Sequence, residues 1–197
     1  NCPLTVNPNQ EDTDGNGVGD ICEVSVAAPS AQNQIIFNEV LADPGGGDAN
    51  GDLTGNNIQD EFIELVNITS GALTLAGCEI SDSNAVRHRF EGAPEQSAYV
   101  VQPKQGVVIF GGGSPTTSQF AGALVFSASS NALGLNNTGD TLTLKCGTTT
   151  LETLTYATEA NHDQSISRSI DGDPNSTFSQ HSTLQTDVPY SPGTCLG

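Results

Sequence analysis

Basic residues are scarce in this chain. Its 197 residues carry 5 Lys and Arg against 23 Asp and Glu, which gives a formal net charge of -18. The first basic residue is Arg87, and 14 acidic residues precede it. A surface with this excess of negative charge repels phosphate backbones and anionic lipid headgroups, so we expect no nucleic-acid partner. The same charge attracts cations such as Ca²⁺.

Long apolar runs are also missing. No stretch approaches the roughly 20 apolar residues that a membrane-spanning helix needs. The first residues lack the basic and apolar pattern of a signal peptide. We therefore expect no membrane insertion, and we expect a mature or excised piece of a longer product. The length suits one β domain with a small appendage, and we expect a monomer.

Methionine and tryptophan are absent, but five cysteines stand at positions 2, 22, 78, 146 and 195. None forms a C-x-x-C pair and histidine is rare, which favours disulfides over zinc ligation. Disulfides predict an oxidising compartment, so we expect an extracellular location, either secreted or on the cell surface. The odd count leaves one thiol free, or its partner lay on a missing part of the parent chain.

The most acidic stretch is EDTDGNGVGDICE, residues 11–23. Counted from Asp12, it matches every specified position of the calcium loop D-x-[DN]-x-[DN]-G-x5-E. The predicted ligands of this first calcium site are Asp12, Asp14, Asn16, Val18 through its carbonyl, Asp20 and Glu23. Prolines on both sides exclude the helices of an EF-hand. The alternative is a solvated acidic turn.

Residues 1–23 resemble a thrombospondin type 3 repeat. The resemblance rests on the Asn-Cys-Pro opening, the Asn-Pro-x-Gln middle and the Gly-Asp-x-Cys ending. It implies little regular secondary structure, an ion-organised fold and a disulfide. Cys2 and Cys22 are the only local pair, although Cys2 could instead pair with a preceding repeat. The small, polar residues 24–34 are interpreted as a linker.

Beyond residue 34, short aliphatic and β-branched runs alternate with Gly, Asn and Asp. Residues 141–146 alternate apolar and polar side chains, as a half-buried strand does. No window of helical length carries an apolar stripe. Eight or nine strands at this spacing predict an all-β fold, a β-sandwich, over residues 35–197.

The order of several segments within residues 34–197 resembles a lamin tail domain of the bacterial secreted type. The segments are IIFNEVLADP, DEFIELVNITSGALTLAGCEISDS, LGLNNTGDTLTLKC, SISRSIDGD and the closing SPG. The resemblance implies an immunoglobulin-like β-sandwich that serves as an accessory module without catalytic residues of its own. The chain departs from the family pattern at Cys78, where a core tryptophan is usual.

Cys78 and Cys146 both fall at inward-facing positions of their predicted strands. A buried bridge between them is the favoured interpretation, and two reduced core cysteines are the alternative. Cys195 could instead bond either of them.

A second acidic cluster follows the first predicted strand. Its DANGD segment repeats the D-x-N-x-D spacing, but the sixth position is Leu53 and the twelfth is Gln59, so the calcium-loop pattern is incomplete. The possible ligands of a second calcium site are Asp43, Asp48, Asn50, Asp52, Asp60 and Glu61. The alternative is a solvated, flexible acidic loop.

Catalytic motifs find no support. His88, His162 and His181 are separate in the sequence and are interpreted as surface residues. Glu39 and Glu64 lie on neighbouring predicted strands, but Glu64 is expected to serve the adjacent loop or to point to solvent. No G-x-S-x-G elbow is present.

The sequence therefore predicts a calcium-binding, non-catalytic interaction or spacer module of an extracellular or cell-surface protein. Calcium ions are the expected ligand, and the macromolecular partner would be an extracellular protein or a glycan. The alternatives are a calcium-dependent carbohydrate-binding module, or an accessory domain of a secreted nuclease or phosphatase.

Overall fold

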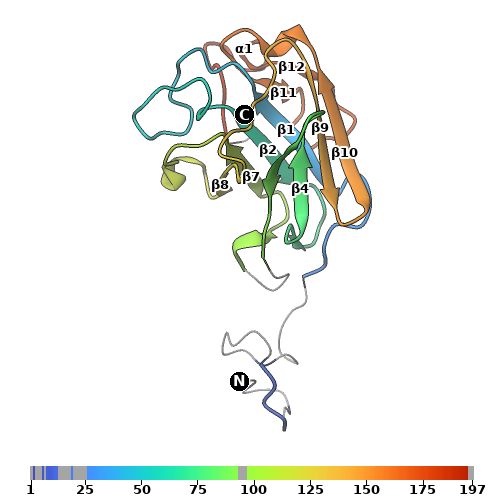
Figure 1. Cartoon of the computed structure of the whole chain (residues 1–197). Helices are drawn as coiled ribbons and strands as arrows, with labels where there is room; N and C mark the ends of the chain where they lie inside the picture. Colours follow the sequence, from blue (N-terminus) through green and yellow to red (C-terminus); the bar gives the residue numbers. More distant parts are fainter. Residues whose placement is uncertain are drawn as a thin grey trace.

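Twelve strands and four short helical turns make up the regular structure of the described residues (Figure 1). The structure is a computed structural model that describes residues 2, 6, 8–12, 19, 26–92 and 97–194. The strands are β1 (Ile35–Leu41), β2 (Phe62–Asn67), β3 (Leu73–Thr74), β4 (Cys78–Ser81), β5 (Val86–Arg89), β6 (Val100–Val101), β7 (Gly106–Phe110), β8 (Leu124–Ser127), β9 (Asp140–Cys146), β10 (Thr149–Tyr156), β11 (Ile166–Arg168) and β12 (Phe178–Gln180). The helical turns are η2 (Ser97–Tyr99), η3 (Thr117–Gln119), η4 (Thr158–Ala160) and α1 (His181–Leu184). The prediction of an all-β fold is confirmed.

Two larger sheets pack face to face as a sandwich (Figure 1). The six-stranded sheet has the order β12-β11-β1-β2-β7-β8, and the four-stranded sheet has the order β10-β9-β4-β5. Strands β3 and β6 form a small third sheet. Neighbouring strands are antiparallel except for β7 and β8, which run parallel.

The structure contains more strands than the eight or nine that the sequence predicts. The run LTLAGCEIS divides into β3 and β4 around a turn at residues 75–77. Strands β5, β11 and β12 read VRHR, ISR and FSQ, which are short and largely polar. Such segments lack an apolar alternation of useful length, so only their neighbours in the sheet identify them as strands.

The main core lies between the two larger sheets. Phe37, Leu65 and Val107 of the six-stranded sheet pack in one cluster with Leu142 and Leu144 of β9. The burial of β9 alternates along the strand, with Leu142 and Leu144 inside and Thr141, Thr143 and Lys145 less buried. The alternation predicted for residues 141–146 is therefore confirmed.

Strand β1 is buried on both of its faces, since all seven of its residues are buried. One face belongs to the main core, and Leu41 on the other face joins a second cluster with Phe62, Phe110 and Phe120. A β-bulge interrupts the pairing of β1 with β2 between Phe37 and Glu39. The extra residue of a bulge bends the strand and redirects the side chains beside it.

A buried ion pair supports the bulge. Arg168 is 4% exposed and its Nε donates a hydrogen bond of 2.7 Å to the carbonyl oxygen of Phe37. Its guanidinium also pairs with the carboxylate of Glu152, which accepts the N–H of Phe37. The backbone groups of Phe37 are thereby satisfied by side chains from β11 and β10, as buried backbone groups must be.

A disulfide joins Cys78 of β4 to Cys146 of β9, 68 positions apart in the sequence. The two residues are direct partners in the antiparallel register of these strands. The predicted bridge is therefore confirmed. Cys195 lies outside the described residues.

Loss of this disulfide should lower stability strongly. A Cys78→Ala and Cys146→Ala double variant should lose about 4 kcal/mol of unfolding free energy, because the bond closes a long loop in the unfolded chain. Urea titration followed by circular dichroism measures the change. A double variant that unfolds at the same urea concentration as the wild-type chain would contradict the expectation.

Candidate functional site

The loop between β1 and β2 gathers the side chains of the DANGD segment. The N–H of Asp52 donates to Asp48 Oδ1 and to Asn50 Oδ1, each at 3.0 Å. The N–H of Leu53 donates to Asp48 Oδ2 at 2.9 Å. Side-chain oxygens of Asp48 and Asn50 therefore meet at one backbone N–H group of a tight turn, and the carboxylate of Asp52 accepts the N–H of Thr54 at 3.0 Å.

Asp60, at the other end of the loop, reaches back to this turn. Its Oδ1 accepts the N–H of Asn50 at 2.9 Å, and its Oδ2 accepts the N–H of Asn56 at 2.7 Å. Asp60 and Asn50 are both 0% exposed. Burial raises the pKa of Asp60 above its ordinary value, although its hydrogen bonds with backbone N–H groups oppose the shift. A hydrogen-bonded turn with two buried polar residues differs from a fully solvated loop.

The other two predicted ligands direct their hydrogen bonds elsewhere. Asp43 Oδ2 accepts the N–H of Asp163 at 3.4 Å. Glu61 Oε2 accepts the N–H groups of Gly134 at 2.8 Å and Leu135 at 3.3 Å. Burial raises the pKa of Glu61 to about 7. These contacts draw Asp43 and Glu61 toward other segments of the chain.

No group of three or more His, Cys, Asp and Glu side chains is arranged to hold a metal ion within the part of the chain that the structure describes. A calcium site in the β1–β2 loop would thus need the amide oxygen of Asn50 beside the carboxylates. The second calcium site stays a prediction.

A glycine-rich turn after β7 packs against the DANGD turn, and sequence reasoning gave it no role. The N–H of Ser114 donates to Asp52 Oδ2 at 3.0 Å, and Asn50 Nδ2 donates to the carbonyl oxygen of Gly112 at 3.3 Å. Gly113 has φ of 74°, and a Cβ there would lie 2.5 Å from Asp52 Oδ2. Only glycine allows the backbone to come this close to Asp52. The run of three glycines directly after a predicted strand was therefore the sequence signal for a close contact at this turn.

The first predicted calcium loop falls almost entirely outside the described residues. Asp12 is described and is partly buried. The other ligands, Asp14, Asn16, Val18, Asp20 and Glu23, lie outside the described residues. Cys2 is one half of a disulfide, and Cys22, its predicted partner, also lies outside them.

Two carboxyl groups lie side by side on the face of the six-stranded sheet that points away from the main core. Glu39 of β1 and Glu64 of β2 are direct partners in the antiparallel register. Glu39 is 1% exposed and Glu64 is 2% exposed. The expectation that Glu64 serves the adjacent loop or points to solvent is therefore wrong, because the segment near residue 193 covers it.

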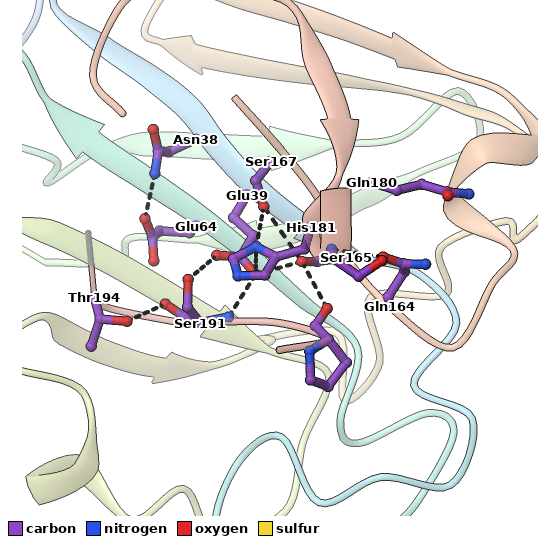
Figure 2. A network of polar contacts seen from close by, with 12 residues as sticks. Asn38, Glu39, Glu64, Gln164, Ser165, Ser167, Gln180, His181, Ser191 and Thr194 are labelled. Atoms are coloured by element: carbon purple, nitrogen blue, oxygen red, sulfur yellow. Dashed lines mark hydrogen bonds and ion pairs between the residues drawn. The ribbon is translucent and has the colours of Figure 1, made fainter. Parts of the chain in front are cut away.

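Three hydrogen bonds from two parts of the chain converge on Glu39 (Figure 2). Ser165 Oγ donates to Glu39 Oε1 at 2.5 Å, and the N–H of Ser191 donates to the same oxygen at 2.9 Å. Ser191 Oγ donates to Glu39 Oε2 at 3.1 Å. The carboxyl group therefore ties the C-terminal segment to β1.

Glu64 is held in a similar way. Asn38 Nδ2 donates to Glu64 Oε1 at 2.9 Å, and the N–H of Gly193 donates to Glu64 Oε2 at 2.5 Å. Burial raises the pKa of Glu39 to about 7. Burial, and next the neighbouring charge of Glu39, raise the pKa of Glu64 to about 8.

Two of the three histidines are buried, so their interpretation as surface residues is wrong. His181 is 0% exposed, and its Nδ1 lies 2.8 Å from Ser167 Oγ and 3.5 Å from Glu39 Oε1 (Figure 2). Burial lowers its pKa, which favours the neutral ring. His88 is 4% exposed, and burial lowers its pKa to about 4. His162 is exposed, as predicted.

Comparison with protein-family models matches residues 28–158 to the lamin tail domain. The chain belongs to the lamin tail domain family. No curated protein matches the chain. The lamin tail domain is an immunoglobulin-like module, which agrees with the sandwich. In this chain its larger sheet continues past the match, because β11 pairs with β1 and β12 with β11.

The match begins at residue 28, and the resemblance of residues 1–23 to a thrombospondin type 3 repeat stays a prediction. The Cys78–Cys146 disulfide indicates an oxidising environment. Among the described residues, no helix has the length and apolar character needed to span a bilayer.

The buried glutamates should make the domain less stable as pH rises. The folded state binds the proton of Glu64 more tightly than the unfolded chain, in which a glutamate has a pKa near 4.5. The stabilisation that the proton on Glu64 adds to the unfolding free energy is therefore fully present below about pH 4.5. It is lost as pH rises through about 8. The unfolding free energy of the wild-type chain should fall between these two pH values. In Glu64→Gln the fall should be smaller, by on the order of 4 kcal/mol.

Urea titrations at several pH values measure this difference. Asp187→Asn is the matched control, because Asp187 is exposed and the same neutral amide replaces a carboxyl group there. Parallel pH profiles for the wild-type chain and Glu64→Gln would contradict the expectation.

Proposed function

We propose that this lamin tail domain is a calcium-binding, non-catalytic interaction or spacer module of an extracellular or cell-surface protein. The observation that carries the proposal is the DANGD turn, in which the side-chain oxygens of Asp48 and Asn50 converge on the backbone N–H of Asp52. Asp60 is bonded to the same turn.

Oxygen side chains at alternate positions of a tight turn are the arrangement by which calcium loops surround an ion. Hydrogen bonds with backbone N–H groups do not use all the acceptor sites of these side chains, since a carboxylate offers about four lone-pair sites. The remaining sites could bind an ion. The charge supports the same proposal, because residues 1–86 contain no lysine or arginine to balance their acidic residues. Asp43 and Glu61 are retained as further possible ligands of this site.

The proposal extends to the first calcium loop, Asp12 to Glu23. Its complete motif supports an ion that would neutralise the acidic N-terminal segment and stiffen it. In a thrombospondin-type repeat with little apolar content, such an ion would replace the missing hydrophobic core. The segment would then act as a rigid spacer before the sandwich.

The absence of catalysis is supported by the burial of the best nucleophile and base. Ser167 and His181 lie within hydrogen-bonding distance, as a nucleophile and a general base do. Ser167 is 1% exposed and His181 is 0% exposed, so no substrate reaches the hydroxyl group. The pair serves the packing of α1 against β11.

A protein partner is favoured over a glycan. Sugar-binding surfaces use exposed aromatic rings, yet none of the three tyrosines is exposed and the chain has no tryptophan. Tyr156 is buried, and Tyr99 and Tyr190 are partly buried. These positions weigh against the carbohydrate-binding alternative.

Millimolar Ca²⁺ should raise the melting temperature of the full chain, because extracellular calcium modules bind at about 10⁻⁴ to 10⁻³ M. Calorimetric titration should give two ions per chain. Asp48→Ala with Asp52→Ala should remove one of them, and Asp14→Ala with Asp20→Ala should remove the other. Asp187→Asn, which changes an exposed acidic residue outside both loops, is the control.

Two results would contradict the proposal in different ways. An unchanged stoichiometry in the Asp48 and Asp52 double variant would remove the second site and leave the first. An identical melting temperature in calcium and in excess chelator would remove calcium as a structural element altogether.

A further inference from the structure

A cavity of about 320 Å³ lies on the outer face of the six-stranded sheet, and none of its lining residues belongs to the β1–β2 loop. Asn38 and Glu64 line it from β1 and β2, and Asp171 lines it from the loop after β11. Val66 and Ile68 contribute aliphatic wall. The cavity therefore combines a buried carboxyl group, Glu64, and a partly buried one, Asp171, with an apolar wall, as small-molecule and side-chain pockets do.

Neighbouring carboxyl groups act on Glu64 in this cavity. Glu39 and Asp171 both act on Glu64 by charge repulsion, and both raise its pKa. Lys104 lines the same cavity but is exposed. Burial is the larger cause of the raised pKa, and Glu64 therefore holds a proton at neutral pH.

The orientation of the Asn38 amide determines which kind of cation the cavity can bind. The N–H of Gly172 donates to Asn38 Oδ1 at 3.1 Å, which fixes the orientation of the amide. Asn38 Nδ2 then donates to Glu64 Oε1 at 2.9 Å and to Asp171 Oδ1 at 3.1 Å. An N–H donor therefore stands between the two carboxyl groups, where a metal ion would require an oxygen ligand.

We propose that this cavity binds a primary ammonium group carried on an aliphatic chain. The ammonium group would donate hydrogen bonds to Glu64 and Asp171, and the alkyl chain would pack on Val66 and Ile68. Lysine side chains of other proteins and free alkylamines share this chemistry. The net charge of -18 favours the approach of either cation.

The proposal implies a linkage between binding and protons. A bound ammonium group stabilises the carboxylate of Glu64, so binding releases the proton that Glu64 holds at neutral pH. The charged and titratable groups that face Glu64 are Glu39 from β1, Asp171 from the β11–β12 loop and Lys104 before β7, with His181 behind Glu39. Amines keep their own proton up to about pH 10. Affinity should therefore rise with pH through about 8 and then level off.

Nuclear magnetic resonance of the ¹⁵N-labelled full chain tests the proposal with n-butylamine and with Nα-acetyl-lysine methylamide. The backbone N–H groups of Gly172 and Gly193 report on the cavity, since they bond Asn38 and Glu64. Both resonances should shift in a saturable manner. Glu64→Gln should weaken binding about tenfold, because a charge-assisted hydrogen bond is lost.

Three further variants make the result specific. Asp171→Asn should also weaken binding, and it tests the cavity without altering the buried face of β2. Lys104→Gln should strengthen binding, because it removes a like charge from the rim. Asp187→Asn should have no effect, because Asp187 is exposed and is not one of the lining residues. Tighter binding of the lysine derivative would identify a protein lysine as the ligand, and tighter binding of butylamine would identify a free amine.

Several outcomes would overturn the proposal. One is the absence of a saturable shift with either amine at millimolar concentration. Another is equal affinity in the wild-type chain and in Glu64→Gln. A third is a Ca²⁺ titration that shifts the Gly172 and Gly193 resonances at lower concentration than the amines do.

Discussion

The burial of β1 and β2 on both faces is the constraint on which the rest of this structure depends. One face of these strands forms the core of the sandwich, and the other lies under loops and the segment near residues 191–193. Polar side chains on the outer face must therefore find partners inside the protein. The bulge beside Asn38 places Asn38 and Glu39 next to Glu64, and these residues bond the covering segments.

Carboxyl groups organise the loops of this molecule mainly through backbone N–H groups. Asp48 and Asp60 shape the β1–β2 loop, Glu61 holds residues 134–135, and Glu39 and Glu64 hold residues 191–193. A chain with only 5 lysines and arginines has few cations for this task. Backbone N–H groups bond the carboxyl groups instead. Burial raises the pKa of Glu39, Glu61 and Glu64.

The sequence predicted those features that arise from local pattern. Period-two alternation identified the long strands, and it placed Cys78 and Cys146 on inward faces, where they form a disulfide. The family resemblance, based on the order of short motifs, was confirmed over residues 28–158. The calcium loops follow from spacing alone and stay predictions.

Features that depend on distant segments escaped sequence reasoning. Glu64 alternates with apolar neighbours, which is the pattern of a solvent-facing residue, and only residues 191–193 convert that face into an interior. His181 precedes Ser182 in a polar stretch, yet packing of α1 against Ser167 buries it. Strands β5, β11 and β12 are defined by their partners, and Arg168 gains its role from a bulge more than 120 positions away.

The cross-strand bond between β4 and β9 also determines how the domain would respond to tension. If the chain were pulled from residues 26 and 194, the segment between Cys78 and Cys146 could not be drawn out while the bond is intact. A separation of 68 residues corresponds to roughly 230 Å of extended chain. Under mechanical load the domain would thus retain this length of chain and release it only after reduction of the bond.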